Sequence, residues 1–83
     1  MDQTLGYLRE TLANYNDEHS EGKHLYRKLS EGHFSSEGSF VRQLNQKEIH
    51  FLNKILPDEI KYAKEEQDEK RAYELNEVFE LLF

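Results

Sequence analysis

The side chains in this sequence that could bind a metal ion or transfer protons are four histidines and 17 acidic residues, but their spacing favours neither role. His19 and His24 are five residues apart, so a helix would not place them on one face, and no HExxH pattern is present. The acidic run 65–69 lacks the glycine that a calcium loop needs in its turn. We expect a solvated acidic surface and ordinary surface histidines, which are His19, His24, His33 and His50.

The chain also lacks the residues that covalent catalysis and phosphate binding would need. The chain has no cysteine, which excludes a thiol nucleophile, a thiolate zinc site and disulfides, and fits a reducing compartment. It has no glycine-rich phosphate loop and no GxSxG pattern, and the Ser- and Gly-containing stretch 35–39 has no adjacent lysine. The sequence therefore predicts a protein that is not an enzyme and has no catalytic residue, no cofactor and no metal.

The charge balance bears on nucleic-acid binding. Eleven Lys and Arg residues against 17 Asp and Glu give a net charge of −6, which excludes coating nucleic acid by bulk charge. Lys23, Arg27 and Lys28 form a small basic spot near Tyr26 and His24. A helix that reads a DNA groove normally has more cationic support. Nucleic-acid contact through this spot is therefore kept as the alternative hypothesis.

The composition predicts a single domain over 1–83. About a quarter of the residues are Leu, Ile, Val or Phe, which is enough to form a core despite a mean hydropathy of −0.95. The N-terminus carries acid rather than base and has no apolar run, so we expect no secretory signal. No stretch is long and apolar enough for a membrane span, and we expect no membrane contact.

The N-terminal half of the chain predicts two helices. Leucines at spacings of three and four residues predict a helix over 2–16. A second helix is predicted over 20–31, with Gly32 as a left-handed C-cap. Residues 33–39 read as a loop, with a hairpin of very short strands as the alternative. A turn or two of helix is expected around Phe40.

The C-terminal half predicts two helices that separate at Pro57. Asn45 and Glu48 have the spacing of a capping box, which marks the start of the first helix. Proline lacks the amide donor that an unbroken helix needs and suits the first turn of a new helix. We therefore expect helices over 46–56 and 57–82.

The charged run 64–71 has no apolar residue, but it also has no Gly, Pro or Asn. We therefore expect it to be a solvated helical bridge within the last helix. The sequence predicts an all-α fold, a small antiparallel bundle of three to four helices with a long C-terminal helix. The predicted core consists of Leu5, Leu8, Leu12, Leu25, Leu29, Phe40, Leu44, Ile49, Leu52, Leu56, Ile60, Ala63, Leu75 and Val78.

The last turn of the chain is apolar on every side. One helix of a small bundle seldom buries all its sides, so this turn either folds back onto the core or contacts a partner. We expect the contacting partner to be a second copy of the chain, in a homodimer, or another protein. The predicted interface consists of Phe79, Leu81, Leu82 and Phe83.

Three stretches carry a family resemblance: DQTLGYLRE at 2–10, FLNKILPDEIKYAKEEQDEKRA at 51–72 and ELNEVFELLF at 74–83. Together they resemble a small Bacillus family of sigma-G-dependent, sporulation-specific, acid-soluble spore proteins. The resemblance implies a forespore protein of the spore core, in the cytoplasmic compartment. We expect it to act by protein contact or as a spore constituent. It implies no molecular activity, and the Gly-rich DNA-binding motifs of the major alpha/beta-type spore proteins are not visible here.

Overall fold

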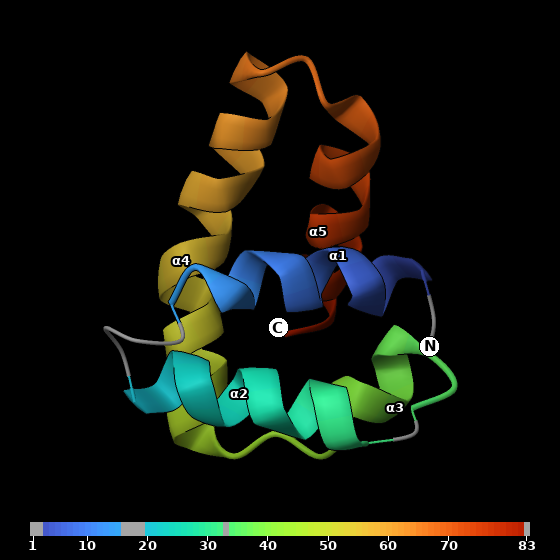
Figure 1. The fold of residues 1–83 in the computed structure, drawn as a ribbon. Coiled ribbons are helices and arrows are strands. Elements are labelled where there is room, and N and C mark those ends of the chain that lie inside the picture. The colour runs from blue at the N-terminus through green and yellow to red at the C-terminus, as the bar shows by residue number, and fades with distance from the viewer. Residues whose placement is uncertain (1–2, 16–19, 33, 83) are drawn as a thin grey trace.

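The part of the chain that the structure describes forms five helices, and the all-α prediction is confirmed (Figure 1). The computed structural model describes residues 3–15, 20–32 and 34–82, and these residues contain no strand. Their radius of gyration is 11.6 Å, which is that of a compact domain of this length. The helices are α1 (Gln3–Ala13), α2 (Ser20–Glu31), α3 (Glu37–Val41), α4 (Gln46–Glu65) and α5 (Glu69–Leu81).

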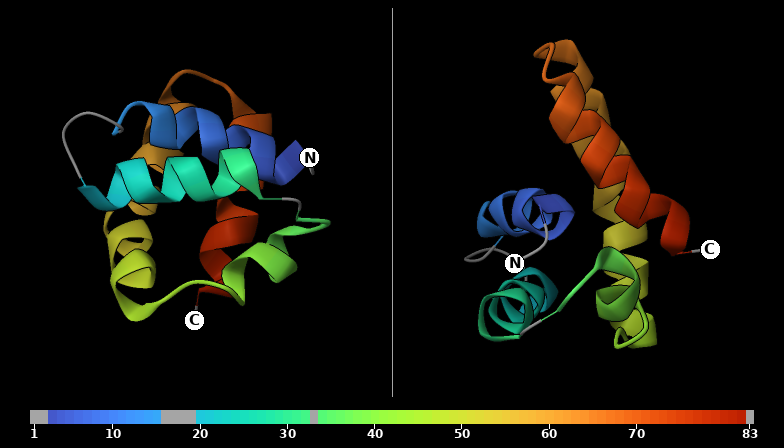
Figure 2. Two further views of the ribbon diagram at one scale, coloured as in Figure 1. Left: turned by 60° about the horizontal axis from the view of Figure 1, so that its bottom comes forward. Right: turned by 90° about the vertical axis from the view of Figure 1, so that its right-hand side faces the viewer.

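The helices pack in two layers. The pair α1 and α2 runs antiparallel and lies on one side of a second antiparallel pair, the α4–α5 hairpin (Figure 2). The short helix α3 packs against α5. Arg71 of α5 ties the layers together, because its guanidinium lies 3.1 Å from the Glu10 carboxylate and 5.7 Å from the centre of the Tyr7 ring.

The core lies between these layers and contains most of the predicted side chains. Leu44 and Ile49 are exceptions, because they lie near the start of α4 at the edge of the core and remain half-buried. Phe51 is buried although it was not predicted, and its ring packs edge-on against Tyr15 with centres 5.8 Å apart. The buried apolar residues are Leu5, Leu8, Leu12, Leu25, Leu29, Phe40, Phe51, Leu52, Ile55, Leu56, Ile60, Ala63, Ala72, Leu75 and Val78.

The predicted break at Pro57 is wrong. Helix α4 continues through Pro57 to Glu65, and the proline is exposed on its water-facing side. A helix can accept proline where the ring meets solvent, although the carbonyl of Asn53 four residues earlier loses its amide donor. Twenty residues make α4 about 30 Å long, which still fits the 30 Å length of the molecule.

The chain instead reverses inside the charged run that was predicted to be helical. Gln67 has a φ of 63°, in the left-handed region. The amide of Asp68 donates to the Ala63 carbonyl at 2.8 Å and that of Gln67 donates to the Lys64 carbonyl at 3.0 Å, which is the Schellman pattern of a helix end. Asp68 then caps α5 by accepting from the Arg71 amide at 3.2 Å. The predicted helix over 57–82 is therefore two helices.

The region around Gly32 also differs from its prediction. No glycine among the described residues has a positive φ, so Gly32 is not a left-handed cap. A Cβ on Gly32 would lie 2.8 Å from the Lys28 carbonyl oxygen and would overlap the Phe34 ring, so this position needs glycine because of close packing. The hairpin alternative is also wrong, since Ser36 and Ser39 form a capping box that begins α3.

Replacing Pro57 with alanine is expected to raise the free energy of unfolding by about 1–2 kcal/mol. Alanine supplies the missing amide donor and removes no packing, because Pro57 is exposed. Part of this gain is offset by the greater freedom of alanine in the unfolded chain. Urea unfolding followed by circular dichroism measures the change, with Asp58→Ala as the control next to it. A Pro57→Ala chain no more stable than the native one would contradict this reading.

Candidate functional site

A buried carboxylate joins α2 to α4. The side chain of Glu48, in the first turn of α4, is 0% exposed. Its Oε1 atom accepts from the Asn45 amide at 2.8 Å, while the Asn45 side chain accepts from the Glu48 amide at 2.8 Å. The capping box predicted from the sequence is therefore confirmed. We call Glu48 with its partners Asn45, Lys28 and His24 the Glu48 cluster.

Two basic side chains, those of Lys28 and His24, reach this carboxylate from α2. Lys28 and His24 are four residues apart, so they lie on one face of the helix. The Lys28 ammonium donates to Oε1 of Glu48 and to the Gln43 carbonyl, both at 3.0 Å. Nε2 of His24 lies 3.0 Å from Oε2 of Glu48, but without hydrogen-bond geometry, so among the described residues Oε2 is a buried acceptor with no donor.

The Glu48 cluster is suited to holding helices together rather than to reacting with a substrate. Its carboxylate is sealed from solvent, and a base that abstracts a proton must reach the substrate. Within the part of the chain that the structure describes, no three His, Cys, Asp or Glu side chains are placed to hold a metal ion. The cluster therefore uses its charges internally.

The three residues of the alternative nucleic-acid hypothesis are not equivalent in the structure. Lys23 and Arg27 are exposed on α2. Lys28 is turned toward Glu48 and donates two hydrogen bonds within the fold. The basic spot therefore presents two cations to solvent rather than three, which weakens its attraction for phosphate.

The predicted partner interface at the end of α5 is largely folded back. Phe79 and Leu82 are partly buried against the core, whereas Leu81 is 43% exposed. Phe83 lies outside the described residues, as do His19 and His33. The described part of this turn thus offers one projecting apolar side chain.

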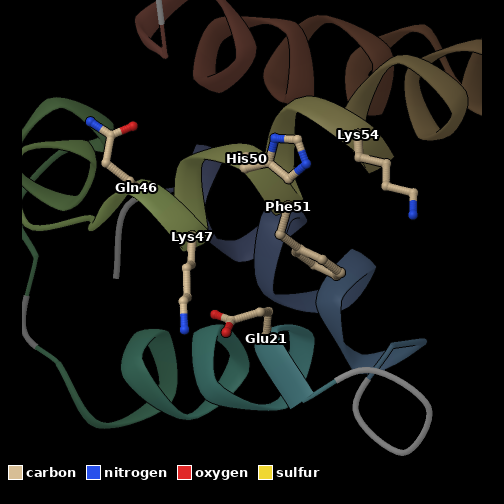
Figure 3. A pocket seen from close by; sticks show the side chains of 6 residues that line it. All are labelled: Glu21, Gln46, Lys47, His50, Phe51 and Lys54. Carbon is tan, nitrogen blue, oxygen red and sulfur yellow. The ribbon is translucent and has the colours of Figure 1, made fainter.

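A hollow of about 490 Å³ lies between the start of α2 and the start of α4 (Figure 3). Lys47, His50 and Lys54 come from α4 and Glu21 from α2, and the Lys47 ammonium is directed toward Glu21. Phe51 forms the apolar inner wall. The remaining lining residue is Gln46. Lys47 and Lys54 on its rim could pair with an acidic side chain of another protein.

The rim of this hollow belongs to a longer basic surface. Lys47, Lys54 and Lys61 recur every seven residues on the exposed side of α4, and Lys64 follows one turn later. We call these four lysines the basic face of α4; Asp58 and Glu65 are exposed acids among them. The seven-residue spacing of these lysines is present in the sequence, but the predicted break at Pro57 assigned Lys54 and Lys61 to different helices.

Helix α5 has more acidic than basic side chains. Glu69 and Glu80 are exposed, Glu77 is half-buried, and Tyr73 is 63% exposed among them. A hydrogen bond to the Glu77 carboxylate and the charge of that carboxylate raise the pKa of Tyr73 above its ordinary value. We call these four residues the acidic face of α5; Lys70 is an exposed cation beside them.

A second tyrosine, Tyr15, links the turn after α1 to α4 and makes the stability of the fold decrease at alkaline pH. The Tyr15 hydroxyl donates to Oε1 of Glu59 at 2.9 Å, and burial, followed by this bond, raises the pKa of Tyr15. The native state therefore favours the neutral phenol, and this contribution is complete below pH about 10, where an unfolded tyrosine ionises. Above that pH the contribution of Tyr15 to the free energy of unfolding falls by about 1.4 kcal/mol for each pH unit.

Tyr15→Phe is accordingly expected to flatten the fall in the free energy of unfolding between pH 9.5 and 11, relative to the native chain. Urea unfolding at a series of pH values measures both slopes. Tyr73→Phe serves as the comparison, because its ring is exposed and its effect should be smaller. Equal slopes for Tyr15→Phe and the native chain would show that the pKa of Tyr15 is the same in the folded and the unfolded state.

Comparisons with known proteins agree with the resemblance seen in the sequence. A family model described as CsgA, minor curli fiber component A, matches residues 1–83. The "Sigma-G-dependent sporulation-specific SASP protein" of Bacillus subtilis (strain 168) is 50% identical over 82 residues, which are 99% of this chain and 99% of that protein. No solved structure matches. The chain therefore belongs to the family that this model describes and is a homologue of the Bacillus subtilis sporulation-specific SASP protein.

Proposed function

We propose that this chain is a non-catalytic sporulation protein of the forespore and spore core that acts by contact with protein surfaces. The observation that carries the proposal is the row of four exposed lysines on α4, which are Lys47, Lys54, Lys61 and Lys64. Complementary charged surfaces steer and orient protein association. The printed name of the Bacillus subtilis relative supports the sporulation setting.

The way the fold uses its reactive side chains supports a non-catalytic role. Glu48, a fully buried carboxylate, is held by Lys28 and the Asn45 amide. The hollow beside Lys47 and Lys54 is lined by side chains of both charges and by the Phe51 ring, and no Ser, Thr or Cys is among its lining residues. In the described residues no helix is both long and apolar enough to cross a bilayer.

The fibre named in the description of the family model is not part of the proposal. Cross-β fibres are built from segments of high β propensity and low charge that stack as strands. This chain is 34% charged and its described residues are helical. A helical contact surface accounts for the charge pattern without any change of fold.

Cross-linking in sporulating cells tests the proposal. A tagged native chain is compared with Lys47→Glu/Lys54→Glu, which reverses part of the basic face. The matched control is Lys23→Glu/Arg27→Glu, which makes the same change in net charge on α2. We expect a protein adduct that the first variant loses and the control retains.

Two results would contradict the proposal. One is an adduct that both variants retain equally, because the hairpin surface would then be irrelevant to it. The other is retention of duplex DNA at low salt that Lys23→Glu/Arg27→Glu abolishes, which would favour the nucleic-acid alternative. Mobility-shift measurements at micromolar protein give the second answer directly.

A further inference from the structure

A second hollow lies where α1 crosses the α4–α5 hairpin (Figure 1). Its volume is about 290 Å³, at the small end of the range for ligand pockets, so its size suits a small molecule. Three helices form its inner wall, because α1 contributes Thr11, α4 contributes Ala63 and α5 contributes Leu75. These three side chains are buried.

Two opposite charges line this hollow, and the fold holds both of them in place. Oε1 of Glu59 accepts from the Tyr15 hydroxyl at 2.9 Å. The Arg71 guanidinium donates to the Glu10 carboxylate at 3.1 Å and to the Asp68 carboxylate at 3.3 Å. A carboxylate has a second oxygen, and a guanidinium has more N–H donors than these two bonds use. Charged groups that are already ordered bind a ligand at a lower cost in conformational entropy.

We propose that this hollow binds a free basic amino acid. The carboxylate of the ligand pairs with Arg71, its α-ammonium pairs with Glu59, and its cationic side chain pairs with Glu66. Pairs of this kind are charge-assisted hydrogen bonds, which are stronger than neutral ones. The inference goes beyond the protein contact proposed above and uses none of the lysines on which that contact depends.

The excess of carboxylates in the lining selects a basic side chain. Glu66 is an exposed lining residue seven positions after Glu59, which is two turns or about 10 Å further along the chain. After an α-ammonium has paired with Glu59, Glu66 still presents a negative charge, which favours a cationic side chain and opposes an acidic one. Tyr62 lines the hollow between these two positions and is 53% exposed, so its ring is accessible to a cation.

Two uncharged polar side chains from the end of α1 add hydrogen-bonding groups. The Thr11 hydroxyl donates to the Tyr7 carbonyl at 3.0 Å, and its oxygen can still accept from an ammonium group. Asn14, in the turn after α1, offers both a donor and an acceptor. A buried wall with a few polar groups around it is typical of sites for small ligands.

L-arginine is the probe that tests this site. We expect a dissociation constant on the order of 0.1–1 mM at low salt, because a ligand with few atoms gains little binding energy in a hollow that is open on one side. Amide chemical shifts followed by NMR during a titration measure the affinity. The amides of Thr11 and Ala63 are expected to shift, and those of His50 and Phe51 in the other hollow are expected to stay unchanged.

Two simpler ligands test the three-point recognition. L-alanine lacks the cationic side chain, and agmatine, which is arginine without its carboxylate, lacks the partner of Arg71. Each is expected to bind at least about tenfold more weakly than L-arginine. Agmatine that binds as tightly as L-arginine would overturn the inference, because the acidic surface would then attract any organic cation.

Glu59→Gln removes the charge from the site but keeps an oxygen that accepts from the Tyr15 hydroxyl. It is expected to weaken L-arginine binding by about tenfold. The control is Glu21→Gln, which makes the same change in net charge at a half-buried residue of the other hollow and should bind within about twofold of the native chain. Circular dichroism checks that both variants are folded. Equal losses in the two variants, or no saturable shift in the native chain up to about 10 mM L-arginine, would overturn the inference.

Discussion

Replacing Glu48 with alanine is expected to lower the free energy of unfolding by about 2–4 kcal/mol. The substitution removes one half of the capping box that begins α4 and leaves the Lys28 ammonium without its carboxylate. Losing a cap costs about 1 kcal/mol, and an unpaired cation costs more when it is partly shielded from water. The Lys28 side chain is 24% exposed, so it can regain some hydration, which keeps the loss below that of a fully buried pair.

Thermal unfolding followed by circular dichroism measures this loss as a lower midpoint, by roughly 4–8 °C for each kcal/mol in a domain of this size. Lys28→Ala and the double substitution complete a double-mutant cycle, and we expect a coupling of about 1–3 kcal/mol between the two side chains. Lys23→Ala, on the same helix but exposed, is the control and should change stability by less than about 0.5 kcal/mol. Purely additive effects of the two substitutions would mean that the contact does not stabilise the fold.

Replacing Phe40 with alanine is expected to have a still larger effect, about 3–5 kcal/mol. Phe40 is 0% exposed and is the one buried residue of the five-residue helix α3. Its ring packs edge-on against Phe34 with centres 5.2 Å apart. A helix so short has little stability of its own, so removing this side chain leaves a cavity and releases α3 from α5.

Urea unfolding and amide hydrogen exchange together check this expectation. We expect a lower midpoint for Phe40→Ala and faster exchange in α3 than in α4. Phe40→Leu is the control, because it keeps most of the buried volume and should cost roughly half as much or less. Uniform exchange across all helices in Phe40→Ala would contradict a local role for this side chain in holding α3.

The sequence was a good guide to features that depend on neighbours along the chain. Leucines 5, 8 and 12 form a stripe within one helix, and all three are buried. Asn45 and Glu48 are three residues apart, and their reciprocal hydrogen bonds begin α4. The family resemblance was likewise carried by consecutive residues and is confirmed by the Bacillus subtilis homologue.

The predictions from sequence were wrong where the preference of a single residue was outweighed by packing in the folded protein. Pro57 normally ends a helix, but one missing hydrogen bond on an exposed side was outweighed by the apolar residues that α4 buries before and after it. The true end of α4 uses Gln67 in a left-handed conformation, where glycine is the usual residue. A glutamine gives no such signal, so the turn could not be located from residue types alone.

The sequence by itself therefore determined the helical class, the apolar stripes, the cap of α4 and the absence of thiol chemistry, because each depends on composition or on residues within one or two turns. Only the tertiary structure decided that Lys28 contacts Glu48, twenty residues away, and thus that a predicted phosphate contact is an internal ion pair. It alone showed that α4 packs against α5, since their relation depends on where the chain reverses. Contacts between distant residues follow from how whole helices pack, which no local spacing specifies.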